Sequence, residues 1–169
     1  QVSAAGGTAS SLTQSPSIYR TPTYSPDGGS IVYRKAGGNS DLGRIHTKKP
    51  GIYIMNANGG DAQFLLNKGA SPRFSADGKR IFLQTGGNYF GNLTKKLISV
   101  DLNGQDEREH ISSKYANWLV PSPDNKWIAF THLHKVFVAP LQMTGKVIDL
   151  DKNSKSVPVS ALAKDAGIG

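Results

Sequence analysis

Apolar segments of strand length recur three times along the 169-residue chain, each directly behind the same kind of polar turn. The turns resemble Ser-Pro-Asp-Gly and lie at residues 24–28, 74–78 and 121–125. The apolar strands that follow them lie at residues 31–33, 81–83 and 127–130. The serines of successive turns are 50 and then 47 residues apart. A recurrence of this length predicts a stack of similar supersecondary units.

The residues of each turn suit a tight connection between two antiparallel strands. In the first copy, Pro26 presets the backbone angle of the first central position, and the carboxylate of Asp27 can accept hydrogen bonds from nearby N–H groups. Gly28 can adopt a positive φ at little cost. The same structural roles are predicted in the other copies for Asp77, Gly78, Asp124 and Asn125.

One strand is predicted before each turn and one after it, and two further strands follow in every unit, which makes each unit a four-stranded antiparallel meander. The third strands lie at 51–55, 96–100 and 135–139, and Asn-Gly or Thr-Gly hairpin turns follow them. The fourth strands lie at 62–66 and 108–112 and, in the last unit, at either 146–150 or 157–162. Such sheets arranged radially make a β-propeller. The predicted fold is therefore all-β, a single partial propeller with blades at about 17–67, 68–114 and 115–162, flanked by parts of neighbouring blades at 1–16 and 163–169.

Composition narrows the function classes. The chain carries a formal net charge of +8, but its Lys and Arg residues are spread over all three units, with no basic helix or aromatic-rich basic stripe. We interpret this charge as a solvated surface and expect no specific nucleic-acid partner. Cysteine is absent, which excludes a thiolate nucleophile and a zinc-thiolate site. No apolar run is long enough for a transmembrane helix.

The repeated motif resembles that of TolB-type, WD40-like Asp-repeat propellers. The resemblance covers residues 22–150 and is carried by the three acidic turns in register with their strands, by Gly-Ile-Tyr-Ile-Met at 51–55 and by the segment 97–104. It is similar to propeller regions that precede bacterial amidohydrolase domains, and to those of tricorn and prolyl-oligopeptidase-like peptidases. The resemblance implies a periplasmic or secreted protein. The start at Gln1, without Met or a leader, predicts a processed or excised piece of a larger chain.

Three blades are fewer than the roughly four to eight of a closed propeller, so the two end sheets would expose apolar faces. We expect these faces to be covered by the missing blades of a parent protein, by a protein partner, or by a homodimer that completes a six-bladed ring. The sequence favours a non-catalytic module for protein interaction or substrate gating, a fragment of a larger bacterial hydrolase. The alternatives are a propeller-type hydrolase or lyase acting on a small molecule or sugar in a central channel, or a structural fragment without activity of its own.

The connection between the second and third strands varies most in length, and the longest example, residues 34–50, is the candidate binding loop. Its polar residues Asn39, Asp41, Arg44 and His46 are the candidate contacts. The alternative interpretation is a flexible insertion.

His132 and His134 have the only spacing suggestive of a metal site, because residues two apart in a strand share a face. The neighbouring unit offers four candidate third ligands, Asp101, Glu107, Glu109 and His110. The alternative is a solvated pair at a strand end. No cofactor and no catalytic residue is predicted, because Ser112, Ser113 and His110 are not joined by an evident third triad member and no Gly-x-Ser-x-Gly motif occurs.

Overall fold

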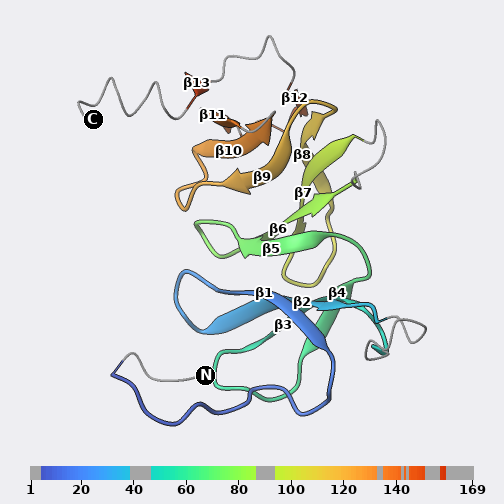
Figure 1. Ribbon diagram of the computed structural model, residues 1–169, viewed down its shortest axis with the longest axis vertical. Coiled ribbons are helices and arrows are strands. Elements are labelled where there is room, and N and C mark those ends of the chain that lie inside the picture. Colours follow the sequence, from blue (N-terminus) through green and yellow to red (C-terminus); the bar gives the residue numbers. More distant parts are fainter. Residues whose placement is uncertain are drawn as a thin grey trace.

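The computed structural model describes residues 5–38, 47–86, 94–132, 135–141, 143, 145–150 and 157–158. These residues form three mainly antiparallel sheets that follow one another along the molecule (Figure 1). The predicted all-β fold is confirmed. The described part contains no helix that could span a membrane.

Each sheet begins with the strand that precedes a repeat turn. The strands follow one another across the three sheets in a similar order. Sheet 1 consists of β1 (Ile18–Tyr24), β2 (Ser30–Ala36), β3 (Gly51–Asn56) and β4 (Gln63–Leu66), in that order. Sheet 2 consists of β5 (Ala70–Phe74), β6 (Arg80–Thr85), β7 (Lys95–Asp101), β8 (Arg108–Ser113) and β12 (Ile148–Asp149). Sheet 3 consists of β9 (Asn117–Pro121), β10 (Trp127–His132), β11 (Lys135–Pro140) and β13 (Val157–Pro158).

The fourth strand of sheet 3 is the one element whose position the sequence left open. The segment 146–150 does not take that place. Its strand β12 instead pairs in parallel with β8, so that it adds a fifth strand to sheet 2. The side chain of Leu150 is buried in the core between sheets 2 and 3, and its N–H donates to Ser112 O at 3.0 Å. The second alternative, 157–162, contains β13, which pairs with β11.

The repeated turns share one hydrogen-bond pattern centred on the serine. The hydroxyl of Ser75 donates to Asp77 Oδ1 at 2.5 Å and accepts from the N–H of Arg80 at 2.9 Å. Asp77 Oδ1 also accepts from the N–H of Lys79 at 3.1 Å. The turns at Ser25 and Ser122 repeat these bonds. Gly28, Gly78 and Asn125 hold φ values of 73°, 69° and 58°. Each turn therefore closes through side-chain bonds and a left-handed residue.

Two apolar cores hold the sheets together. Between sheets 1 and 2, Val32 and Ile52 pack against Ile81 and Val100, all of them almost completely buried. Between sheets 2 and 3, the core includes Phe82, Leu97, Ile111, Leu119, Ile128 and Phe130. Complete burial of one such side chain contributes about 1.5–3 kcal/mol to folding. Because side chains alternate between the two faces of each strand, one face of sheet 2 contributes to each core.

A third apolar cluster lies on the far face of sheet 1, away from sheet 2. It contains Ile31, Tyr33, Tyr53, Met55 and Ala57. Leu12 packs against this cluster from the chain that precedes β1, which Figure 1 shows in dark blue below the sheet. This segment lies beside sheet 1 and forms no strand of its own.

We predict that Gly78→Ala lowers the free energy of unfolding by about 1–2 kcal/mol, because an L-residue is strained at its φ of 69°. An added Cβ would approach its nearest neighbour, Pro26 Cδ, at an ordinary 3.7 Å, so the cost comes from the backbone alone. Denaturant unfolding measures the change. The control Gly37→Ala, in open space without a positive φ, should leave stability unchanged, and equal effects of the two substitutions would contradict the explanation.

Candidate functional site

The first strands of the three sheets form a row of edge strands along one side of the molecule. β1, β5 and β9 each pair with only one neighbour, and Thr23 Oγ1 donates to Pro72 O at 3.1 Å between β1 and β5. Their three hairpin turns lie on the same side of the molecule, the left of Figure 1. Prolines at 22, 72 and 121 remove N–H groups from these strands, which disfavours the addition of a further strand. A ligand at this face would therefore be held mainly by side chains.

The first strands β1, β5 and β9, which we call the inner strands, each contain a bulge at the same position of the repeat. The register shifts between Arg20 and Thr23 in β1, and equivalent shifts occur in β5 and β9. Inside the shifts, Thr21, Ser71 and Trp118 adopt φ values of 48°, 50° and 52°. Each of these residues lies four positions before the serine of its turn. Left-handed conformations are unfavourable for Thr and Trp, and such strain concentrates at functional positions.

Basic and aromatic side chains are exposed on these strands. Tyr24 and Trp118 are 51% and 60% exposed. Arg20 and Arg73 are also exposed, and neither side chain takes part in a hydrogen bond or ion pair with the described residues. Their guanidinium groups therefore remain available to a ligand. A groove of about 290 Å³ runs between the turns, lined by Thr23, Tyr24, Pro26, Arg73, Phe74, Ser75, Ala76, Pro121, Ser122 and Pro123.

The carboxylates of the repeated turns are committed to their own loops. The hydroxyl of Ser25 holds the pKa of Asp27 below its usual value, and the N–H of Gly29 acts in the same direction. Ser75 and Ser122 do the same for Asp77 and Asp124. These carboxylates stay ionised at neutral pH and shape the turns.

A second hollow, of about 480 Å³, lies at the opposite end of the strands. Its lining consists of Thr94, Ser112, Lys114, Tyr115, His132, Asp149 and Leu150. The ring of His132 stacks on that of Tyr115 with centroids 3.6 Å apart. Because a carbonyl oxygen can only accept, the 2.8 Å contact between His132 Nδ1 and Tyr115 O places a proton on Nδ1. In the neutral ring, Nε2 is then the atom left to act as an acceptor.

Most of the residues predicted for binding lie outside the described part of the chain. This holds for Asn39, Asp41, Arg44 and His46 of the candidate loop, and for His134 of the histidine pair. Both predictions therefore stay predictions. Among the described residues, no three His, Asp or Glu side chains are grouped to hold a metal ion.

The four candidate third ligands are engaged elsewhere. Asp101 Oδ1 accepts from the N–H groups of Asn103 and Gln105 within the β7–β8 turn. Glu107 and Glu109 form ion pairs with Lys68 and Lys96, and His110 is buried.

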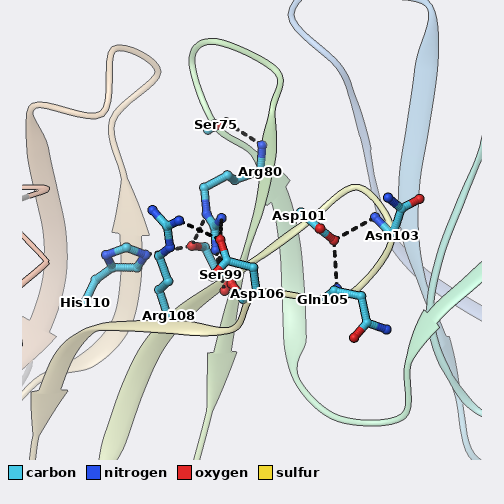
Figure 2. A network of polar contacts seen from close by, with 9 residues as sticks. All are labelled: Ser75, Arg80, Ser99, Asp101, Asn103, Gln105, Asp106, Arg108 and His110. Atoms are coloured by element: carbon cyan, nitrogen blue, oxygen red, sulfur yellow. Dashed lines mark hydrogen bonds and ion pairs between the residues drawn. The ribbon is translucent and has the colours of Figure 1, made fainter.

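His110 belongs to a polar network that clamps the hairpin between β7 and β8 (Figure 2). Its Nε2 lies 2.7 Å from Ser99 Oγ, which also accepts from Arg80 Nε at 2.7 Å. Arg80 also forms an ion pair with Asp106, and Asp106 forms a second ion pair with Arg108. Ser99 is fully buried and His110 is 5% exposed. This hydroxyl–imidazole pair has the distance of a nucleophile and its base, but no substrate could reach it, so its role is structural.

Other polar contacts separate the predicted serines from His110. Ser113 Oγ donates to Leu150 O and accepts from the N–H groups of Tyr115 and Ala116. Ser112 lines the second hollow. The described structure thus joins neither serine to His110.

The sequence pattern did not single out the inner-strand residues Arg20, Arg73 and Trp118 as candidate contacts. Each lies in a strand that the motif located, but the bulges change the side-chain alternation, and exposure depends on how neighbouring sheets stack. One signal was present: Thr21-Pro22 and Ser71-Pro72 repeat a hydroxyl residue followed by proline at the bulge of two units.

Comparison with known proteins supports the fold. No protein-family model and no curated protein sequence matches the chain. Among solved structures, TolB from Acinetobacter baumannii is 20% identical with a TM-score of 0.61, over 86% of this chain and 35% of that one. A protein described as TolB from Agrobacterium tumefaciens is 20% identical with a TM-score of 0.59, over 91% of this chain and 53% of that one.

The β-propeller domain of the Trilobed protease from Pyrococcus furiosus is also similar, 15% identical with a TM-score of 0.54, over 84% of this chain and 42% of that one. The chain thus spans about half or less of the length of these proteins. The likeness shows that the chain has the fold of part of a β-propeller, as these proteins do, and the predicted resemblance is confirmed at the level of the fold.

We predict that the protein loses stability as the pH falls below about 6.5, because burial lowers the pKa of His110 and the nearby Arg80 and Arg108 lower it further. Between the lowered pKa and 6.5, the unfolded chain binds a proton that the folded chain does not, so the free energy of unfolding decreases as the pH falls. Denaturant unfolding between about pH 7.5 and 5 measures this slope.

His110→Gln should flatten the slope, whereas the control His132→Gln should keep it. An unchanged slope in His110→Gln would assign the pH dependence to other groups. Titration of the His110 imidazole by NMR checks the direction of the shift independently.

Proposed function

We propose that this propeller arc is a non-catalytic module for protein interaction, and that it contacts its partner through the inner strands β1, β5 and β9. The observation that carries the proposal is the pair of exposed guanidinium groups, Arg20 and Arg73, which have no partner among the described residues. Exposed arginines elsewhere in the described structure can be satisfied internally, as Arg108 is by Asp106. The inner-strand arginines are instead available for an external anion.

The partner that fits this face is an acidic protein segment. The chain carries a net charge of +8, which favours association with acidic surfaces. A guanidinium can bind a carboxylate through two parallel hydrogen bonds, and exposed aromatic residues such as Tyr24 and Trp118 are frequent anchors of protein interfaces. The left-handed bulges fix the backbone from which these side chains project.

The larger setting is part of the same proposal. A hydrolase parent is supported by the similarity to the propeller domain of a protease, which this chain covers only in part. The resemblance to TolB-type proteins favours a periplasmic or secreted location. In that setting the arc mediates protein contacts or gates access to an attached catalytic domain. The loop at 34–50, with Asn39, Asp41, Arg44 and His46, remains the candidate binding loop.

The alternative function is a hydrolase or lyase acting on a small molecule or sugar. The observation that favours it is the second hollow, where His132 Nε2 has no partner among the described residues and Lys114 and Asp149 line the same space. His132 and His134 remain the candidate metal ligands.

We predict that Arg73→Glu weakens binding of a polyglutamate peptide by at least about tenfold, because it replaces a charge-assisted hydrogen bond with repulsion. Isothermal titration or fluorescence anisotropy measures the affinity at fixed ionic strength. The control Lys114→Glu makes the same charge change at the second hollow and should have a much smaller effect. Absence of binding to the wild type, or equal losses in both variants, would contradict an acidic partner on the inner strands.

We also propose that the arc forms a homodimer that completes a six-bladed ring, and expect light scattering to give twice the monomer mass. Trp127, on the far face of sheet 3, is 48% exposed. Trp127→Asp should dissociate the dimer, because it places a charge in an apolar contact. The control Trp118→Asp alters an inner-strand tryptophan and should leave the mass unchanged. A monomeric wild type at high concentration would refute the homodimer.

A further inference from the structure

The repeat assigns the same orientation to corresponding residues of the three sheets. Ile81 of sheet 2 packs towards sheet 1, and Ile128 of sheet 3 packs towards sheet 2. Both lie four residues after the aspartate of their turn. Ile31 has the same position in sheet 1. By this equivalence, its face of sheet 1 is the one that would pack against a preceding sheet.

This face of sheet 1 is apolar and is already covered. Ile31, Tyr33 and Met55 are 6%, 7% and 5% exposed, although the described part of the chain forms no further sheet beside them. A row of aromatic rings crosses the four strands, from Tyr19 through Tyr33 and Tyr53 to Phe64, with successive centroids 5.4–5.8 Å apart. Burial raises the pKa of Tyr33 to about 12. The face therefore has the character of an interior surface.

Residues 5–17, which we call the strap, lie on the side of sheet 1 away from sheet 2 (Figure 1). Leu12 packs on the apolar cluster, and its Cδ2 lies 3.6 Å from the position that a Cβ on Gly59 would occupy. Tyr19 donates its hydroxyl proton to Ser15 O at 2.8 Å, and Ser17 Oγ lies 3.1 Å from Thr47 Oγ1. Leu12 is the one large apolar residue of the strap, which has no charge and is rich in Gly, Ser and Thr.

The far face of sheet 3 corresponds in the repeat to the faces that sheets 1 and 2 turn towards the next sheet. In sheet 3 this face is exposed. Trp127 and Val136 are each 48% exposed. Ala129 and Val138 pair across β10 and β11 and are only half-buried. Ala129 holds the repeat position of Val32 and Phe82, which are buried where sheets 1 and 2 meet the next sheet. The described residues therefore form no sheet on this face that would continue the stack.

We propose that the strap is an internal substitute for a neighbouring sheet, and that it competes with the sheet 3 face of a second copy for the far face of sheet 1. The proposal rests on the proposed homodimer and adds the event that controls it. A second copy is the occupant that fits, because its sheet 3 offers the same kind of face that already packs on an equivalent surface within one molecule. Such packing occurs between sheets 1 and 2 and between sheets 2 and 3. The contact is head-to-tail, and two such contacts close a ring.

The composition of the strap makes it displaceable. Gly- and Ser-rich segments are flexible when free, so releasing residues 5–17 restores chain entropy. The apolar cover that they supply comes mainly from one leucine, whereas a complete sheet would cover the aromatic row from end to end. Wild-type dimerisation is then weakened by the fraction of molecules in which the strap is seated.

The test measures the dimer dissociation constant by sedimentation velocity for the wild type, Leu12→Asp and Thr8→Asp. Leu12→Asp unseats the strap and is expected to tighten dimerisation about tenfold or more, by removing the burial of one leucine from the competing state. Thr8→Asp introduces the same charge at an exposed strap position and should leave the constant unchanged. Adding Trp127→Asp to Leu12→Asp should return the protein to a monomer.

The outcomes separate the strap from the homodimer. A monomeric wild type with a dimeric Leu12→Asp supports the strap and refutes the wild-type homodimer. A dimeric wild type whose constant does not change in Leu12→Asp keeps the homodimer and overturns the strap. Self-association of Leu12→Asp that survives Trp127→Asp overturns it too, because the contact is then not with sheet 3. If Leu12→Asp does not fold, Leu12→Ser should show the same direction with a smaller factor, and no change there overturns the strap.

Discussion

Every sheet of this protein has two apolar faces, and the need to cover both of them governs the structure. Sheet 2 meets the requirement through its neighbours, with Phe82 on one face and Ile81 on the other. The end sheets have only one neighbour each. Sheet 1 recruits the preceding chain through Leu12, and sheet 3 leaves Trp127 and Val136 exposed. The two ends of the described structure therefore differ in how far their outer faces are covered.

The inner strands meet a different constraint, because they are edges. Edge strands expose unpaired N–H and C=O groups that invite uncontrolled pairing. Prolines and bulges in β1, β5 and β9 reduce that risk, and the same bulges hold Thr21, Ser71 and Trp118 in left-handed conformations. The result is a rigid backbone with exposed arginine and aromatic side chains. Protection of the edge and exposure of these side chains are thus two consequences of one backbone feature.

The polar network of Figure 2 illustrates how a chemical motif can be structural. Ser99 and His110 have hydrogen-bond geometry suited to catalysis, yet both are buried between apolar sheets. Arg80 and Asp106 extend the network to the surface and fix the hairpin that joins β7 and β8. Burial and the nearby guanidinium groups favour the neutral imidazole, so the network stabilises the fold best at neutral pH.

The sequence by itself determined the repeat, because the Ser-Asp hydrogen bonds and the left-handed residue of each turn are local and recur wherever the motif does. Strand order within the first two sheets followed from the same local signals. Only the tertiary structure decided that segment 146–150 joins sheet 2, because β12 pairs with the non-adjacent strand β8 and Leu150 is buried between sheets 2 and 3. It also decided which side chains of the inner strands are exposed and that Leu12 covers sheet 1, because these depend on contacts between sheets, which no local pattern encodes.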